Sequence, residues 1–235
     1  MLSGPLSKKW PNSAGSSLHF AQILPQGRGL IRIMITRRAL LATGLALPLL
    51  PSAGLAEPAP EWTAKLLAAA RSQIGVTTGY DPAYVSLDYP GGDVPRETGV
   101  CTDVVVRAYR DAFNVDLQEL VHIDMKASFN SYPRTWGLTR ADRNIDHRRV
   151  PNLERYFTRE GLKREMPGRR EDWQAGDLVT MRLGGRLPHI AIFAGYDPLT
   201  DKAVYVHNIG AGTREEPIRT DYDYPMRFRF PPLVA

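Results

Sequence analysis

Cys101 is the only cysteine of this 235-residue chain, and its position suits a nucleophile. It follows a loop rich in glycine and proline, and it opens a segment whose apolar residues recur at helical spacing from Val104 to Phe113. We therefore expect the thiol in the first turn of a helix, where unpaired N–H groups and the helix dipole can lower the pKa of a cysteine. Asp103, in the same turn, is explained by that dipole. A small buried residue at a helix start is the structural alternative for Cys101.

Two histidines in the C-terminal half could complete a catalytic site with this thiol. His189 begins one predicted strand and His207 ends the next. Strands joined by a hairpin are antiparallel neighbours, so the start of one lies beside the end of the other. A nucleophilic thiol needs a base and a third group that orients the base. We assign Cys101 as nucleophile, His189 as base and His207 as orienting residue. Asn208 is the alternative orienting group, although its side chain should point to the opposite face.

The elements that must position these residues predict an α+β fold, because helices come first and an antiparallel sheet follows. Residues 131–149 are polar and irregular between the two parts. Gly75 to Gly99 is mostly loop, with a possible short extended piece from Tyr84 to Tyr89. We expect helices over residues 60–74, from residue 101 onward, over residues 117–129 and over a short stretch around 153–157 that stops at Gly161. We expect strands over residues 177–183, 189–194, 203–207 and 226–230.

The net charge of +5 originates in the first 56 residues. These contain six of the 30 lysines and arginines and no acidic residue, which leaves 24 basic against 25 acidic side chains in the rest. The body is nearly neutral, so its charge does not predict nucleic-acid binding. Residues 57–235 are long enough for one domain with a full core.

Residues 1–56 have the pattern of an export leader. Arg37 and Arg38 precede a short apolar run, and small residues lead to Ala56, after which we expect cleavage. The paired arginines resemble a twin-arginine signal, and Met34 is a candidate start. We expect a periplasmic or extracellular protein without a stable membrane span after processing, and a retained anchor is the alternative. In an oxidising compartment an unpaired cysteine needs an explanation, which favours the nucleophile.

Three segments of the C-terminal half carry a family resemblance. They are residues 175–179 (Ala-Gly-Asp-Leu-Val), 188–195 (Pro-His-Ile-Ala-Ile-Phe-Ala-Gly) and 204–207 (Val-Tyr-Val-His). They resemble the NlpC-type cell-wall amidases and peptidases, papain-like enzymes in which the nucleophilic cysteine opens the first core helix. The resemblance implies a papain-like fold with the catalytic histidine at the start of its strand, as His189 is, and a third polar residue on the next strand.

Three further segments point to a narrower family. They are residues 99–103 (Gly-Val-Cys-Thr-Asp), 144–153 (Asn-Ile-Asp-His-Arg-Arg-Val-Pro-Asn-Leu) and 207–212 (His-Asn-Ile-Gly-Ala-Gly). They resemble an exported bacterial domain-of-unknown-function family, number 1287, within the same papain-like group. The chain differs from NlpC-type enzymes in having valine and threonine beside the cysteine, where they usually carry aspartate and serine.

The expected substrate side of the site includes a tyrosine and two arginines. Tyr80 lies in the loop before the cysteine, where papain-like amidases often place an oxyanion or substrate-binding tyrosine. Arg148 and Arg149 have the planar fork that binds carboxylates, in which wall stem peptides are rich. Adjacent residues of an extended segment point to opposite sides, so we expect only one of the two to serve, held by Asp146, with His147 lining the groove. A solvated loop with a local ion pair is the structural alternative.

No metal or cofactor is expected. Cys101, His189 and His207 could supply three ligands, but no second cysteine or His-x-x-x-His spacing supports zinc, and no Walker loop or dinucleotide fingerprint is present. The sequence predicts an exported cysteine hydrolase that cleaves an amide bond, with a cell-wall peptide as its partner. Asn208 is a further candidate for substrate binding. The alternatives are a non-catalytic module of the same fold that holds a wall peptide in its groove, and a transglutaminase-like acyl transferase.

Overall fold

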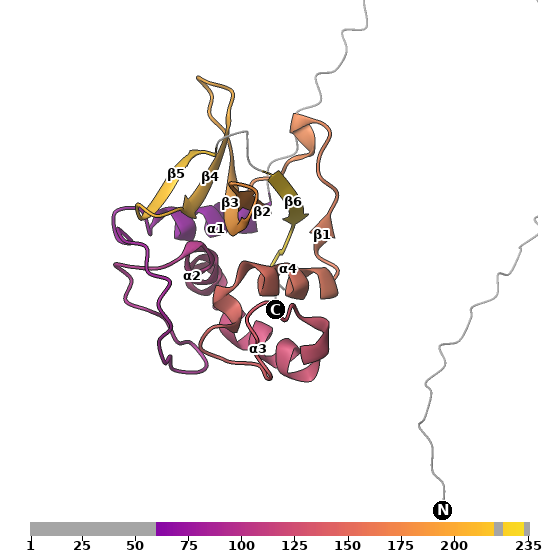
Figure 1. Cartoon of the computed structure of the whole chain (residues 1–235). Coiled ribbons are helices and arrows are strands. Elements are labelled where there is room, and N and C mark those ends of the chain that lie inside the picture. Colours follow the sequence, from indigo (N-terminus) through magenta and orange to yellow (C-terminus); the bar gives the residue numbers. More distant parts are fainter. Residues whose placement is uncertain (1–59, 219–222, 233–235) are drawn as a thin grey trace, which may run out of the picture. The chain divides into compact units, whose positions relative to one another are not determined.

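A six-stranded antiparallel sheet packs on a layer of helices in the computed structural model, which describes residues 60–218 and 223–232 (Figure 1). This confirms the α+β class predicted from the order of the elements. The leader, its expected cleavage site and Met34 lie outside the described residues.

Four α-helices precede the long strands. They are α1 (Glu61–Arg71), α2 (Cys101–Phe113), α3 (Leu117–Ala127) and α4 (Val150–Arg159), and three 3-10 turns accompany them, η1 (Phe129–Ser131), η2 (Asp146–Arg148) and η3 (Arg170–Asp172). All four helices were expected from the apolar periodicity. Asn114 ends α2 in the left-handed conformation at φ 56°, and the Asp116 carboxylate then caps α3 by accepting the backbone N–H of Gln118 at 3.0 Å.

The sheet has the strand order β1-β6-β2-β3-β4-β5. Its strands are β1 (Lys163–Arg164), β2 (Leu178–Leu183), β3 (Leu187–Tyr196), β4 (Ala203–Asn208), β5 (Thr213–Pro217) and β6 (Asp223–Phe228). The four long apolar strands were predicted. The sequence did not predict β1, which has only two residues, or β5, whose sequence Thr-Arg-Glu-Glu-Pro has no apolar alternation. The expected extended piece between Tyr84 and Tyr89 forms no strand.

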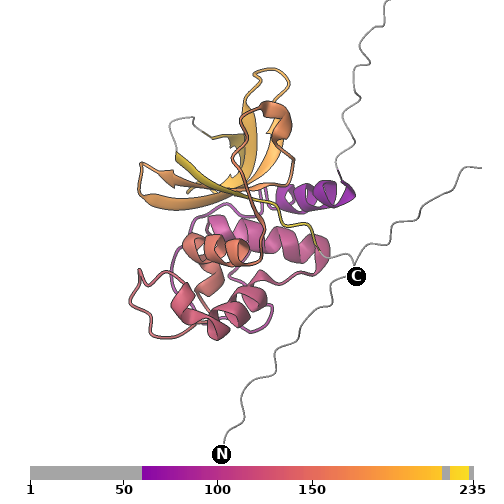
Figure 2. The same cartoon turned by 90° about the vertical axis from the view of Figure 1, so that its right-hand side faces the viewer.

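The helices cover one face of the sheet (Figure 2). The main core joins Val105 and Ala108 of α2 to Ile190, Ile192 and Val206 of the sheet, all of them fully buried. Because this contact fixes α2 against β3 and β4, it also fixes the first turn of α2 near the start of β3. The opposite face of the sheet carries a second, smaller apolar cluster.

None of the helices in the described part of the chain is long and apolar enough to cross a lipid bilayer.

Candidate active site

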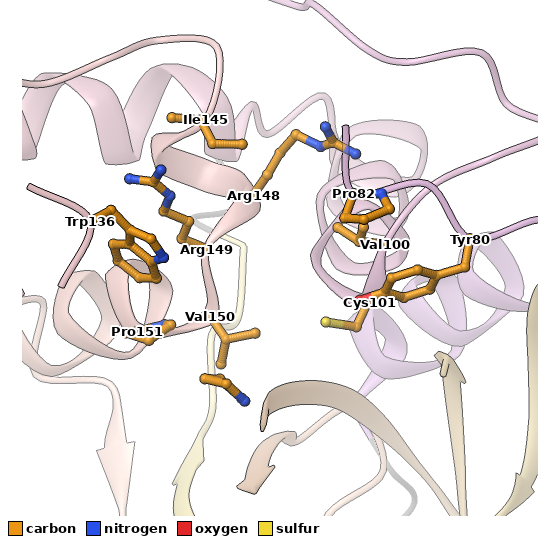
Figure 3. A pocket seen from close by; sticks show the side chains of 11 residues that line it. Tyr80, Pro82, Val100, Cys101, Trp136, Ile145, Arg148, Arg149, Val150 and Pro151 are labelled. Atoms are coloured by element: carbon orange, nitrogen blue, oxygen red, sulfur yellow. The ribbon is translucent and has the colours of Figure 1, made fainter. Parts of the chain in front are cut away.

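Cys101 is the first residue of α2 and lies at the wall of a pocket of about 330 Å³, here named the Cys101 pocket. The residue is 4% exposed. Figure 3 shows the pocket, with Cys101 and Tyr80 on one side and Trp136 and Arg149 on the other. A thiol at the edge of an open pocket, held by a helix start, is in a position to meet a bound substrate.

The thiol is protonated near neutral pH. Burial raises the pKa of Cys101 to about 11. The backbone N–H groups of Ile190, Thr102 and Cys101 itself act in the opposite direction, but they do not compensate for the loss of water. The lowered pKa expected from the helix start is therefore wrong. The sequence indicated the helix dipole correctly but could not indicate how deeply the tertiary packing buries the sulfur.

His189 and His207 form a hydrogen-bonded pair of imidazoles. Nε2 of His189 lies 3.1 Å from Nδ1 of His207, and the two rings meet edge to face. Burial lowers the pKa of His189 to about 3, with a further contribution from His207, and lowers that of His207 to about 4. Both rings are therefore neutral at pH 7, so one nitrogen of the pair donates and the other accepts.

The outer end of this pair points to an acidic side chain. Nε2 of His207 is buried without a hydrogen bond to any residue that the structure describes, and it lies 3.7 Å from Oε1 of Glu216 on β5. That distance is too long for a hydrogen bond but short enough for Glu216 to stabilise a proton on the imidazole. The sequence analysis missed Glu216 because β5 was not predicted, so no register placed it beside β4.

The thiol is linked to the same strand through the residue after His189. The backbone N–H of Ile190 interacts with the Cys101 sulfur. The structure thus brings the start of α2 and the start of β3 together, with the histidine pair on β3 and β4. A direct contact between the Cys101 sulfur and the His189 ring stays a prediction.

Tyr80 lies beside the thiol. In Figure 3 its hydroxyl is directed toward Cys101. Burial raises the pKa of Tyr80 to about 12, and the nearby thiol adds to this shift. The phenol is therefore a neutral hydrogen-bond donor over the working pH range, which is the form needed to stabilise a developing oxyanion.

Arg148 has a structural role, which corrects the expectation that it could bind a substrate carboxylate. Its Nε and Nη2 donate to the two carboxylate oxygens of Asp103 at 3.0 and 2.9 Å, and its remaining donors reach the carbonyls of Asp81 and Ala83 at 3.0 Å each. Asp103 also accepts the Val100 N–H at 2.7 Å. Arg148 thus ties the loop at residues 81–83 to the first turn of α2. Arg148 borders the Cys101 pocket, but four of its five N–H groups are engaged in these bonds, and in Figure 3 it extends toward Pro82.

Arg149 is the arginine that remains available. Its guanidinium lies over the Trp136 ring at 4.2 Å, and its Nη1 is buried without a hydrogen-bond partner in the described residues. Burial lowers the pKa of Arg149, yet an arginine stays charged. The prediction that only one of two neighbouring arginines faces the pocket is therefore compatible with the geometry. The sequence analysis did not identify Trp136 as a pocket residue, because residues 131–149 have no periodic pattern that indicates which side chains face the pocket.

Two further expectations are corrected. Among the described residues Asp146 makes no hydrogen bond to an arginine, although its charge acts on Arg149: its Oδ2 accepts the Asp142 N–H at 2.7 Å and faces Nδ1 of His122 at 3.1 Å. His147 is 2% exposed and does not line the Cys101 pocket.

Asn208 is not available to a substrate or to His189. It is fully buried, and its amide donates to the carbonyls of Gly79 and Gly99 at 3.0 and 3.1 Å. These bonds fasten the end of β4 to the two loops that flank Tyr80 and Cys101. A side chain at Gly99 would be crowded, since a Cβ would lie 3.1 Å from Nη1 of Arg107 and 3.2 Å from the Asp103 Cβ.

No group of three or more histidine, cysteine or carboxylate side chains in residues 60–218 and 223–232 has the arrangement of a metal site.

The fold and the site define an α+β domain with a buried thiol at a helix start and a histidine pair on the adjoining sheet. Residues 67–230 match the model of the family described as Domain of unknown function (DUF1287), and the chain belongs to that family. A relative from Escherichia coli (strain K12), "Uncharacterized protein YijF", is 50% identical over 161 residues, which cover 68% of this chain and 78% of that protein.

A solved structure with a partial likeness is the P60 domain of antigen MAP1204 from M. avium subspecies paratuberculosis. It shares 16% identity with a TM-score of 0.36, covering 72% of this chain and 98% of that one. A similarity of this size does not establish a shared fold.

Proposed function

We propose that this protein is a papain-like cysteine hydrolase that cleaves an amide bond, with cell-wall peptides as its substrate class. The observation that carries the proposal is the single buried cysteine at the start of α2, packed against the strand that holds His189, whose ring is oriented by His207 at 3.1 Å. A nucleophile, a base and an orienting group on neighbouring elements are the parts that covalent acyl transfer needs.

The neutral forms of both groups determine the first step. With the thiol pKa raised to about 11 and the His189 pKa lowered to about 3, no thiolate–imidazolium pair exists at rest. The Cys101 proton passes to His189 as the sulfur attacks the carbonyl carbon, and His207 and Glu216 stabilise the resulting imidazolium. His189 then protonates the leaving amine, which leaves a thioester on Cys101. Water then attacks the thioester carbonyl and gives one proton to His189. The C–S bond breaks, His189 returns that proton to the Cys101 sulfur, and the carboxylic acid product leaves.

The oxyanion of this reaction needs donors close to the sulfur. The backbone N–H of Cys101 belongs to the first turn of α2, where N–H groups have no partner within the helix. The neutral Tyr80 hydroxyl beside the thiol is the second donor in this proposal. Two donors of this kind commonly contribute several powers of ten to the rate.

Arg149 is proposed to bind a carboxylate of the substrate across the pocket from the thiol. Replacing Arg149 with lysine is expected to raise KM about 10-fold on a carboxylate-bearing peptide with little change in stability, because lysine keeps the charge but loses the paired hydrogen bonds.

Replacing Arg148 with lysine is expected to lower the free energy of unfolding by about 2 kcal/mol, since it disrupts a buried network to Asp103 and two carbonyls.

Michaelis kinetics and urea unfolding of the two variants check this contrast. Each variant serves as the control for the other, since both changes are arginine to lysine at adjacent positions. If the KM effect appears at Arg148 and not at Arg149, the assignment of the two arginines is reversed. If neither variant changes KM, carboxylate recognition by this segment is excluded.

The reaction itself is tested by digesting purified peptidoglycan and identifying the fragments by mass spectrometry. Release of new amine and carboxylate ends by the native protein supports a hydrolase. Products joined to an added amine would instead indicate an acyl transferase, and unaltered peptidoglycan that nevertheless binds the protein would indicate a binding module.

We also propose that the protein is exported and processed. The proposal rests on the paired arginines, the apolar run and the small residues that end at Ala56. N-terminal sequencing of the protein recovered from the periplasm or medium should begin at or near Glu57. Recovery with residues 39–50 intact in the membrane fraction would replace this with a retained anchor.

A further inference from the structure

A second cavity adjoins the Cys101 pocket. It has a volume of about 660 Å³, twice that of its neighbour, and the two share Trp136, Pro151 and Pro188 as common walls. Trp136 thus stands between them, and the Arg149 guanidinium lies against the same ring. A ligand that crosses Trp136 would occupy both cavities.

Four cationic side chains line this second cavity, here named the cationic basin. They come from four different parts of the fold: Arg155 from α4, Lys163 from β1, Arg182 from β2 and Arg186 from the β2–β3 turn. The only carboxylate on the lining is Glu154, and both of its oxygens are already bound by Arg182 at 2.9 Å.

The other three cations have no carboxylate partner on the basin wall. Nε of Arg155 is buried and has no hydrogen-bond partner within residues 60–218 and 223–232, and Lys163 and Arg186 are exposed. Arg155 does contribute to lowering the pKa of Asp124, but Arg159 makes the hydrogen bonds to that carboxylate. Beyond the leader the chain has 24 basic and 25 acidic residues, so the basin is a local excess of positive charge in a nearly neutral body.

Concave clusters in which cations outnumber carboxylates attract anions more strongly than isolated surface cations do, because the fields of the cations add in a region that water fills only partly. We propose that the cationic basin binds an anionic group of the same substrate whose amide bond is presented to Cys101. The proposal rests on the proposed function and narrows its substrate class. The substrate carries at least two anionic groups, one bound by Arg149 beside the thiol and one beyond Trp136.

The test measures binding without turnover. In a Cys101→Ala background, isothermal titration calorimetry compares a wall stem tetrapeptide with the same peptide whose carboxylates are converted to amides. The tested variant is Arg155→Gln with Arg186→Gln, which leaves the Glu154–Arg182 pair intact. Arg140→Gln is the matched control, because Arg140 is an exposed arginine that lines neither cavity.

We expect the double variant to bind the native peptide about 10-fold more weakly, with a smaller salt dependence, and Arg140→Gln to bind it within about 2-fold of the parent. The amidated peptide should bind the parent weakly and should not distinguish the variants. Competition by inorganic phosphate far stronger than by acetate would support the anionic site and assign a phosphate group to the basin in place of a carboxylate.

Equal affinity of the double variant and the parent overturns the basin proposal, as does the absence of binding by either peptide or by phosphate. Thermal melting of each variant verifies the fold before titration. Failure of the proposed hydrolysis would appear differently: the protein with Cys101 retained would leave the peptide uncut, while the Cys101→Ala protein would still show basin-dependent binding.

Discussion

Replacing Cys101 with serine is expected to lower kcat/KM for amide hydrolysis by at least about 1,000-fold, equivalent to about 4 kcal/mol of transition-state stabilisation. The hydroxyl is a much poorer nucleophile when its only activation is a neutral imidazole. The change is nearly isosteric in a site that is 4% exposed, so the fold and peptide binding should persist. Steady-state kinetics on defined wall peptides, with calorimetric binding to the same peptides, measures both quantities.

His207→Ala is the informative companion to this variant. An orienting residue contributes less than the nucleophile, so the rate should fall by a smaller factor than in Cys101→Ser, on the order of 10- to 100-fold. Circular dichroism should show both variants folded. Undiminished hydrolysis by Cys101→Ser would exclude Cys101 as the nucleophile. Absence of hydrolysis by the native protein as well, with peptide binding retained, would instead favour the binding module.

The folded domain is expected to lose much of its stability as the pH falls from 6.5 to 5, because three imidazoles are buried in neutral form. Burial lowers the pKa of His147 and His189 to about 3 and that of His207 to about 4, against about 6.5 in an unfolded chain. Between these values the unfolded state binds more protons, so stability decreases as the pH decreases. Each histidine contributes about 2 kcal/mol to the loss at pH 5, and the three together about 6 kcal/mol.

Urea unfolding at pH 7.5, 6.5, 5.5 and 5.0 measures this slope. A loss of that size is comparable to the whole stability of an ordinary domain. His147→Gln is the appropriate control variant, because His147 is buried away from the Cys101 pocket, and it should remove about one third of the slope without altering activity at pH 7. A free energy of unfolding that is flat between pH 7 and 5 would contradict neutral burial of these rings.

Local patterns in the sequence were sufficient for the four helices, for the four long apolar strands and for the pairing of the two histidines, but not for β1 and β5. The apolar repeat after Cys101 predicted α2, and the alternation around Ile190 and Val206 predicted β3 and β4, since both periods are set by backbone geometry alone. A hairpin makes adjacent strands antiparallel, so the meeting of His189 and His207 followed from their places at the strand ends.

Only the tertiary structure decided the charge states and the partners of the charged residues. Whether a helix-start cysteine has a lowered or a raised pKa depends on how much water surrounds it, and here burial outweighs the N–H groups. Arg148 and Arg149 are indistinguishable in sequence, yet one is bound to Asp103 and the other faces the pocket over Trp136. The partner of each lies far along the chain or in an irregular loop, and long-range packing, which no local period encodes, brings them together.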